Sequence, residues 1–314
     1  MKVALIVPVR NGGAAWARCA AGIAAQSRQP DRVLVIDSES TDGSDQVALD
    51  HGFGLQRIQA RDFDHGGTRQ LAAEQCTDCD ILVYLTQDAE LADPDALRRL
   101  LEVFDDAQVA VAYGRQLPRL GAGPIEAHAR LFNYPAQCQL RTSKDVQTLG
   151  LKAAFTSNSF CAYRRSDLLR IGGFPPRVIV SEDMVTAARA LQAGRAVAYV
   201  ADACVLHSHG YTLAQELGRY FDIGVLHNAE HWLLEDFGKA DGEGLRFVVS
   251  QVAYLLRVAP WRLPEAAVRT VFKYLGYKAG LHCQRLPPRW RAALSRQPGY
   301  WGARDMRDLR RAEP

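Results

Sequence analysis

Three apolar runs of the chain each stop abruptly at polar or acidic residues. The run from Ile81 to Leu85 leads into Thr86-Gln87-Asp88, and two earlier runs lead into Arg10-Asn11 and into Asp37-Ser38-Glu39. Short apolar runs that alternate with helical patterns are typical of parallel strands joined by helices. Because ligands bind at the carboxyl ends of such strands, the sequence predicts a ligand site where these three strands end.

The periodicity predicts an α/β domain whose mostly parallel sheet carries helices on both faces. Strands are expected at 3–8, 33–37, 55–59, 81–86, 109–113 and 196–200, and helices near 14–26, 42–51, 67–76, 94–104, 166–171 and 182–193. Between them, residues 114–159 show no clear pattern. A connection that long is seldom idle in a compact domain, so we expect it to shape a substrate pocket.

The charge divides the chain into two regions. Residues 245–311 carry 14 Lys and Arg against 3 acidic residues, a net charge of +11, whereas residues 1–244 carry 24 against 31, a net charge of −7. We expect one domain at 1–230 and a basic helical region at 231–314. The basic region favours an anionic membrane surface as partner. Nucleic acid is not expected, because no nucleic-acid-binding motif is recognisable, and a solvated tail or an oligomer contact is the alternative.

The chain is expected to be cytoplasmic. Its apolar start is only about seven residues long, too short for a signal peptide. No stretch approaches the roughly 20 apolar residues of a membrane span. The seven cysteines are scattered, as reduced thiols are. Cys76 and Cys79 have the C-x-x-C spacing, but without a second pair they do not predict a zinc site.

Two acidic positions each have a structural and a functional interpretation. Asp37 could cap the following helix, but Ser40 or Thr41 would do so better, which leaves Asp37 to accept a hydrogen bond from a base or ribose. Glu182 and Asp183 open a helix, where acidic residues often do no more than complement the helix dipole.

The glycines and histidines add further candidates. Gly66 and Gly67, followed by Arg69 in the first helical turn, could place backbone N–H groups and a guanidinium against a diphosphate. His207 and His209 are two residues apart on an extended segment. They should therefore point to opposite faces, and at most one of them should serve the site.

Taken together, the motifs resemble those of family-2 glycosyltransferases with the GT-A fold, a Rossmann-like domain that binds nucleotide-diphospho-sugars. His65-Gly66-Gly67-Thr68-Arg69 and Leu85-Thr86-Gln87-Asp88-Ala89 are similar to signatures of bacterial rhamnosyltransferases that build O-antigen and related polysaccharides. The resemblance covers residues 1 to about 230 and also rests on Val7-Pro8-Val9-Arg10-Asn11-Gly12, Val35 to Ser44, Gly172-Gly173-Phe174, Ser181-Glu182-Asp183 and His207-Ser208-His209.

The resemblance implies a role for each matching residue. It implies nucleotide and diphosphate contacts at Pro8, Val9, Arg10, Asn11, Asp37, Ser38, Ser40, Arg69, Gln87 and His209. It implies Mg²⁺ or Mn²⁺ at Asp88 and His207, and a catalytic base at Asp183 with Glu182 next in line. Thr86 stands where the family usually has a first carboxylate, which implies weaker metal binding.

The function implied by the resemblance is inverting glycosyl transfer. The donor would be dTDP-L-rhamnose, and the acceptor a glycan carried on a polyprenyl diphosphate at the inner face of the cell membrane. Two alternatives stay open: another donor such as galactofuranose, GlcNAc or glucose, and a non-catalytic sugar-nucleotide-binding subunit of a polysaccharide assembly complex. A nicotinamide dehydrogenase is disfavoured, because the first strand and turn lack G-x-G-x-x-G.

Overall fold

The computed structural model describes residues 1–238 and 242–302 of the 314-residue chain. Its centre is a nine-stranded sheet with the order β3-β2-β1-β4-β8-β6-β9-β5, in which β7 also pairs with β9. The strands are β1 Val3–Val9, β2 Arg32–Asp37, β3 Gly54–Arg57, β4 Ile81–Leu85, β5 Glu90–Leu91, β6 Val109–Leu117, β7 Gln139–Arg141, β8 Phe160–Arg164 and β9 Ala196–Leu206.

The prediction of a mostly parallel sheet is confirmed. β1, β2, β3 and β4 pair in parallel, and so do β6 and β9. β8 lies between the two groups and is antiparallel to both β4 and β6. The ends of β1, β2 and β4 therefore meet at one edge of the sheet, as their polar residues predict.

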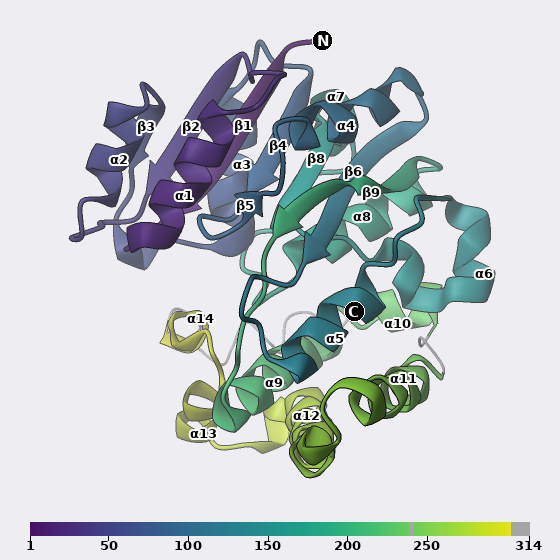
Figure 1. The fold of residues 1–314 in the computed structure, drawn as a ribbon. Coiled ribbons are helices and arrows are strands. Elements are labelled where there is room, and N and C mark those ends of the chain that lie inside the picture. The colour runs from purple at the N-terminus through teal and green to yellow at the C-terminus, as the bar shows by residue number, and fades with distance from the viewer. Residues whose placement is uncertain (239–241, 303–314) are drawn as a thin grey trace.

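Helices cover both faces of the sheet, and each face has its own core. Val3, Leu5 and Val7 face one core with α1 (Gly13–Ala24), α2 (Ser44–Asp50) and α4 (Ala96–Glu102), while Ala4 and Ile6 face the other with α3 (His65–Gln75), α7 (Arg165–Arg170) and α8 (Glu182–Gln192). Successive side chains of a strand point to opposite faces, so a fully apolar strand is what a sheet buried on both sides requires. Figure 1 shows α1 and α2 on the face turned to the viewer.

The segment from residue 114 to 159 is more regular than the sequence predicts. β6 continues to Leu117, and the segment holds α5 (Pro124–Asn133), β7 and α6 (Val146–Leu149). β7 and α6 are only three and four residues long, too short to show a period in the sequence. Short 3₁₀ turns lie at Ala60–Asp62, Val103–Asp105, Ser143–Asp145, Gly150–Ala154, Pro260–Arg262 and Cys283–Arg285.

The helical C-terminal region is also confirmed. It contains α10 (Trp232–Phe237), α11 (Glu243–Val258), α12 (Leu263–Leu281), α13 (Pro288–Leu294) and α14 (Pro298–Gly302), and α9 (Leu213–Ala229) comes just before it. These helices are gathered at the end of the molecule away from the N-terminus (Figure 1). Residues 303–314, which end the predicted basic region, lie outside the described part of the chain. None of the helices in the described part is long and apolar enough to cross a membrane. The domain boundary near residue 230 stays a prediction.

Two glycines let α12 pack closely on α9. A Cβ at Gly276 would lie 2.3 Å from the carbonyl oxygen of Leu217, and a Cβ at Gly280 would lie 2.0 Å from that of Phe221. Both distances are far below van der Waals contact, so only glycine fits these positions without movement of the helices.

Candidate active site

Hydrogen bonds join the loops that follow β1, β2 and β4. The Asn11 backbone N–H donates to Ser40 Oγ at 3.0 Å, and the Thr41 N–H donates to Asn11 Oδ1 at 2.8 Å. Gln87 accepts from the Arg10 N–H through Oε1 at 2.7 Å and donates to the Arg10 carbonyl through Nε2 at 3.2 Å. The three predicted strand ends thus form one connected surface.

Asp37 has an oxygen left over for a ligand. Its Oδ2 accepts from the Ser40 N–H at 3.1 Å, whereas its Oδ1 and the neighbouring Ser38 hydroxyl are buried without a hydrogen-bond partner among the described residues. Buried polar atoms are rarely left unpaired in a folded protein. Helix α2 begins after Gly43 rather than after Asp37, so Asp37 does not cap it. Val9 is buried in the core at the end of β1 and Pro8 is half-buried before it, so the nucleotide contacts implied for these two residues stay a prediction.

Asp88, His207 and His209 form a group that could hold a metal ion. Their ligand atoms all lie within 4.8 Å of one another, with His207 Nε2 3.4 Å from Asp88 Oδ1 and His209 Nε2 3.7 Å from Asp88 Oδ2. The prediction that the two histidines point to opposite faces is wrong. β9 ends at Leu206, so the alternation of a strand does not apply beyond it, and the two rings lie 4.6 Å apart.

The protonation states of this group suit a metal. Burial alone would raise the pKa of Asp88, but the positive charge that His207 and His209 carry when they are protonated holds that pKa well below its ordinary value. Burial lowers the pKa of His207, and burial together with His207 lowers the pKa of His209 to about 4. At neutral pH the group therefore offers a carboxylate and two neutral imidazoles, which are the forms that bind cations.

Three residues that the sequence did not indicate surround this group. Gln116 Oε1 lies 3.0 Å from His207 Nδ1 and accepts from Arg130 at 2.5 Å. Because an amide oxygen only accepts, Nδ1 must carry the proton, and Nε2 is left to face Asp88. Arg119 donates to the Asp88 carbonyl and pairs with its carboxylate at 3.5 Å. All three lie between residues 114 and 159, where no motif marks them.

A second pair of carboxylates, Glu182 and Asp183, opens helix α8. Asn158 joins the pair: its side-chain Nδ2 donates to Glu182 Oε1 and its backbone N–H donates to Asp183 Oδ2, both at 2.9 Å. Tyr163 holds this asparagine by donating to its Oδ1 at 2.8 Å. Ser181, just before the pair, has a left-handed backbone with φ of 59°, a strained conformation of the kind found at functional sites.

The two carboxylates have different electrostatic surroundings. Arg69 pairs with Glu182 at 3.0 Å, and both side chains are buried. Burial alone would raise the pKa of Glu182, but Arg69, His65 and Asn158 hold it below its ordinary value. Burial raises the pKa of Asp183 to about 7, and the charge of Glu182 acts in the same direction. Asp183 is thus the carboxylate that exchanges a proton near neutral pH, which is what a general base requires.

Arg69 has a different neighbour from the one that its motif implies. Its guanidinium pairs with Glu182 and donates to the His65 carbonyl at 2.8 Å, because a buried carboxylate needs a counter-charge. The diphosphate contact implied for Arg69 stays a prediction.

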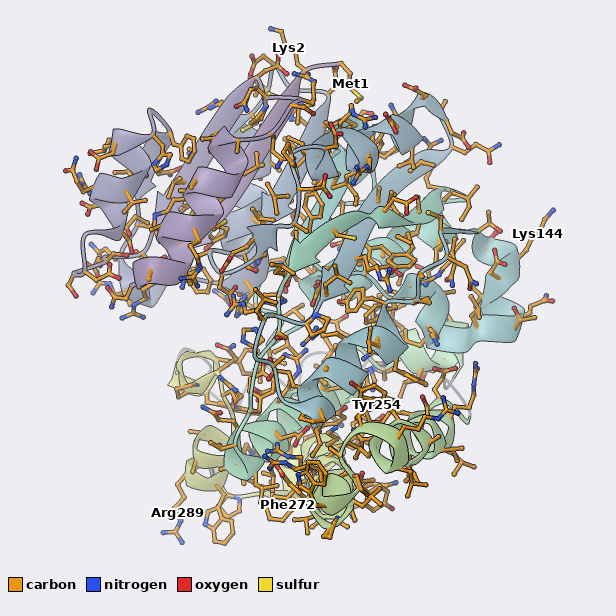
Figure 2. All side chains as sticks on the ribbon, in the orientation of Figure 1. Met1, Lys2, Lys144, Tyr254, Phe272 and Arg289 are labelled. Atoms are coloured by element: carbon orange, nitrogen blue, oxygen red, sulfur yellow. The ribbon has the colours of Figure 1, made fainter. Side chains whose placement is uncertain are left out.

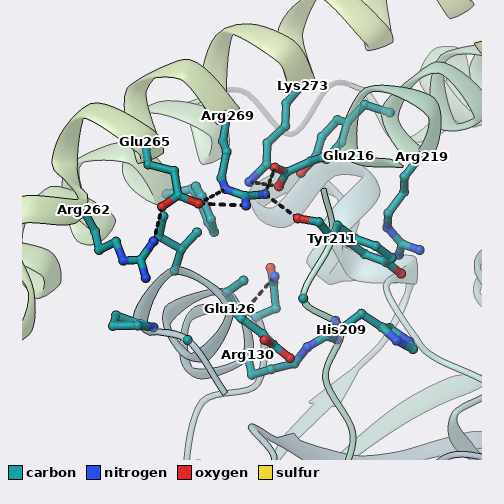
Figure 3. A pocket seen from close by; sticks show the side chains of 18 of the residues that line it. Glu126, Arg130, His209, Tyr211, Glu216, Arg219, Arg262, Glu265, Arg269 and Lys273 are labelled. Carbon is teal, nitrogen blue, oxygen red and sulfur yellow. Dashed lines mark hydrogen bonds and ion pairs between the residues drawn. The ribbon is translucent and has the colours of Figure 1, made fainter. Parts of the chain in front are cut away.

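A cavity of about 440 Å³ lies beside the metal-binding group. His209 and Arg130 belong to its wall, and α9, α11 and α12 supply the opposite side (Figure 3). On that side Arg269 pairs with Glu216 at 2.9 Å, and Lys273 pairs with Glu216 at 3.0 Å. The wall also carries five aromatic residues: Tyr134, Phe155, Tyr211, Tyr220 and Phe247. Aromatic faces beside charged groups suit a ligand with apolar ring faces and many hydroxyls.

Two solved structures with a similar fold were determined in complex with nucleotide sugars. A mannosyltransferase from Pyrobaculum calidifontis, in complex with GDP-Man and Mn²⁺, superposes with a TM-score of 0.62 at 19% identity and covers 90% of this chain and 88% of that one. Residues 1–349 of S. aureus TarS in complex with UDP-GlcNAc give a TM-score of 0.56 at 17% identity, over 99% of this chain and 90% of that one. At these identities the similarity shows the fold alone.

The sequence comparisons show the family. The O-antigen chain rhamnosyltransferase RfbN of Salmonella typhimurium is 45% identical over 302 residues, 96% of either chain, and WbaN of Salmonella anatum, also an O-antigen chain rhamnosyltransferase, is 44% identical over 95% of either chain. Residues 4–172 match the family model of glycosyl transferase family 2. The protein is therefore a glycosyltransferase with a GT-A fold, and the chain belongs to glycosyl transferase family 2.

Proposed function

We propose that the protein transfers L-rhamnose from dTDP-L-rhamnose to a growing glycan with inversion at the anomeric carbon. The observation that carries this proposal is the separation of two carboxylates: Asp88 lies with two neutral histidines, and Asp183 lies on another element with its pKa raised to about 7. A single displacement needs a group that holds the leaving diphosphate and a base for the incoming hydroxyl. The choice of rhamnose rests on the names of the two relatives.

The donor nucleotide is assigned to the edge formed by β1, β2 and β4. Asp37 Oδ1 and the Ser38 hydroxyl, both buried without a partner, are the groups best placed to bond its base or ribose. The loop residues Arg10, Asn11, Ser40 and Gln87 would hold the rest of the nucleotide, and Arg69 is retained as a contact near the diphosphate.

Asp88, His207 and His209 fit a divalent cation, since they combine one anionic and two neutral ligands. Two imidazoles favour Mn²⁺ over Mg²⁺, which prefers oxygen ligands. When bound, such an ion neutralises the charge that develops on the leaving diphosphate. Gln116 keeps His207 in the ligating tautomer, and Arg119, which pairs with Asp88, adds a positive charge beside the diphosphate.

Asp183 is assigned as the base. Its carboxylate takes the proton of the acceptor hydroxyl as that oxygen bonds to the anomeric carbon, and the bond from that carbon to the diphosphate oxygen breaks. Glu182 stays ionised against Arg69, and its charge keeps the pKa of Asp183 high. A base with a pKa near the working pH is the most effective one.

The acceptor is assigned to the aromatic and charged cavity beside His209, with its reactive sugar towards Asp183. We propose that this acceptor is a glycan on a polyprenyl diphosphate. The net charge of +11 in residues 245–311 supports a position on the cytoplasmic, anionic leaflet of the membrane, with self-association as the alternative use of that region.

Thermal unfolding in the presence of Mn²⁺ and a panel of nucleotide sugars tests the donor. A ligand that binds only the folded state raises its unfolding temperature, so dTDP-L-rhamnose should raise it most. UDP-glucose, UDP-GlcNAc and UDP-galactofuranose serve as controls. A larger shift with any of them would reject rhamnose as the donor sugar.

A further inference from the structure

The outer sides of helices α11 and α12 form an exposed apolar surface. On α11, Leu245, Val249, Val252 and Leu256 follow one another at the spacing i, i+4, i+7 and i+11, which places them on one side of the helix. Their exposed fractions run from 40% to 69%. On α12 the exposed apolar residues are Val268, Val271, Tyr274 and Leu275.

Both outer sides point away from one cavity. The inner side of α11 packs on α5, where Phe247 and Tyr254 contact His128 and Ser250 bonds to its ring at 2.9 Å. Phe247 of α11 and Arg269 and Lys273 of α12 line the same cavity. The surfaces opposite to these residues therefore both turn away from the cavity and out of the molecule.

The turn between the two helices continues this surface. Trp261 lies in it with an exposed fraction of 73%. Figure 2 shows Phe272 and Arg289 at the edge of the molecule opposite to Met1 and Lys2. We call Leu245, Val249, Val252, Leu256, Trp261, Val268, Val271, Tyr274 and Leu275 the outer face.

A contiguous apolar surface of this kind on a folded protein usually marks a binding site. Its charges indicate which kind of partner it fits. Residues 244–302 carry ten Lys and Arg and a single acidic residue, Glu265. Glu265 is not free to repel anions, because it lines the cavity and pairs with Arg262 and Arg269. Exposed Arg257 and Lys278 flank the apolar residues.

We infer that the outer face inserts into the surface of an anionic membrane, with α11 and α12 lying in the plane of the interface. An amphipathic helix with apolar residues on one side and Lys or Arg beside them binds in this way, with the long side chains reaching up to the head groups. A second copy of the chain is a poorer partner, because the same basic rim would meet itself.

This inference rests on the membrane partner proposed above, and it adds the orientation of the protein on the membrane. With the outer face on the membrane, α12 separates the lipid surface from the cavity, and its other side presents Arg269 and Lys273 to that cavity. An acceptor attached to a lipid would then enter the cavity from the side of the membrane. The binding energy comes from apolar insertion as well as from charge, so high salt should weaken the binding without abolishing it.

Co-sedimentation of the full chain with vesicles tests the inference. The wild type should sediment with vesicles of phosphatidylcholine that contain about 30% of the anionic lipid phosphatidylglycerol. Less of it should sediment with vesicles of pure phosphatidylcholine. The double variant V249E/L256E should lower the bound fraction by about tenfold or more. The variant Leu49→Glu is the matched control, since Leu49 is 48% exposed on α2, away from this face, and should bind as the wild type does.

Three results would overturn the inference. These are a double variant that pellets like the wild type, an equal loss of binding in Leu49→Glu, and a wild type and double variant that both stay in the supernatant. Light scattering identifies the rival in the last case: a wild-type dimer that V249E/L256E converts to a monomer would make the outer face a contact between copies. Binding of dTDP-L-rhamnose to the same variants is measured in parallel. Failure of the wild type to bind it would count against the proposed donor and leave the membrane result standing.

Discussion

At the level of single residues, the proposed base catalysis depends on the unequal pKa values of Glu182 and Asp183. Both lie at the start of α8, and Asn158 bonds both. Within residues 1–238 and 242–302, Glu182 has an arginine within ion-pair distance and Asp183 has none, so burial raises the pKa of Asp183. One turn of helix thus holds a permanently ionised carboxylate beside one that can take up a proton.

Asp183→Asn should lower kcat by about 10²-fold or more, because general-base catalysis is worth roughly that much. Donor affinity should stay within about twofold of the wild type, since this residue acts on the acceptor hydroxyl. Steady-state kinetics and donor titration measure the two quantities. Near-normal turnover in the variant would move the role of base to Glu182.

The activity of the wild type should rise with pH up to about 7, where Asp183 loses its proton. Well below that pH, turnover should fall by about tenfold per unit. A pH profile of kcat from 5 to 9 measures this. A flat profile between pH 5 and 7 would mean that the raised pKa of Asp183 plays no part in catalysis.

The same shift predicts a change in stability. A folded-state pKa raised from 3.8 to about 7 stabilises the fold below pH 3.8, and this contribution is lost as the pH rises through 7. An asparagine at position 183 does not titrate. The unfolding temperature of Asp183→Asn minus that of the wild type should therefore be larger at pH 8 than at pH 5. An equal difference at the two pH values would contradict the raised pKa of Asp183.

Gln116→Leu should weaken Mn²⁺ binding by about 10–100-fold, the usual effect of removing the group that orients a ligating histidine. Gln116→Glu is the matched control, because it keeps an acceptor for His207 Nδ1 and should retain most of the affinity. Calorimetric titration of Mn²⁺ into each variant measures the effect. Equal affinities in all three proteins would show that His207 needs no orienting partner.

At the scale of helices, the cavity depends on how closely α12 lies on α9. Gly280→Ala should destabilise the protein by about 1–3 kcal/mol, the usual cost of overpacking, because the new Cβ would lie 2.0 Å from the Phe221 carbonyl oxygen. Gly244→Ala is the control, since no atom lies within 4 Å of its Cβ position on α11. Chemical unfolding of both variants measures the difference. Equal stability would mean that the two helices can separate at no cost.

At the scale of the whole molecule, the sequence predicts the sheet and the edge where the site lies, because both are local properties of the chain. A buried strand that ends in a carboxylate can be recognised in a few residues, as at Asp37 and Asp88. The roles predicted for Asp183 and His207 come from the family resemblance, because a helix start or a strand end alone leaves a structural interpretation open.

The rest of the site depends on contacts between distant segments. His209 joins Asp88 because the chain leaves the sheet after Leu206, and that turn cannot be foreseen from the alternation of a strand. Gln116 and Arg130 become site residues only when β6 and α5 bring them to His207 and to each other. Helices from both halves of the chain line the cavity, and no short stretch of sequence predicts that these helices come together.

The most direct test of metal-dependent donor binding is calorimetric titration of dTDP-L-rhamnose into the full chain, once with Mn²⁺ and once with EDTA. We expect binding with Mn²⁺, and loss of that binding in EDTA and in Asp88→Ala, because the cation and the diphosphate each help to hold the other. Asp183→Asn should bind the donor as the wild type does. Equal affinity in Mn²⁺ and EDTA, unchanged by Asp88→Ala, would contradict the assignment of Asp88, His207 and His209 to a metal that holds the donor.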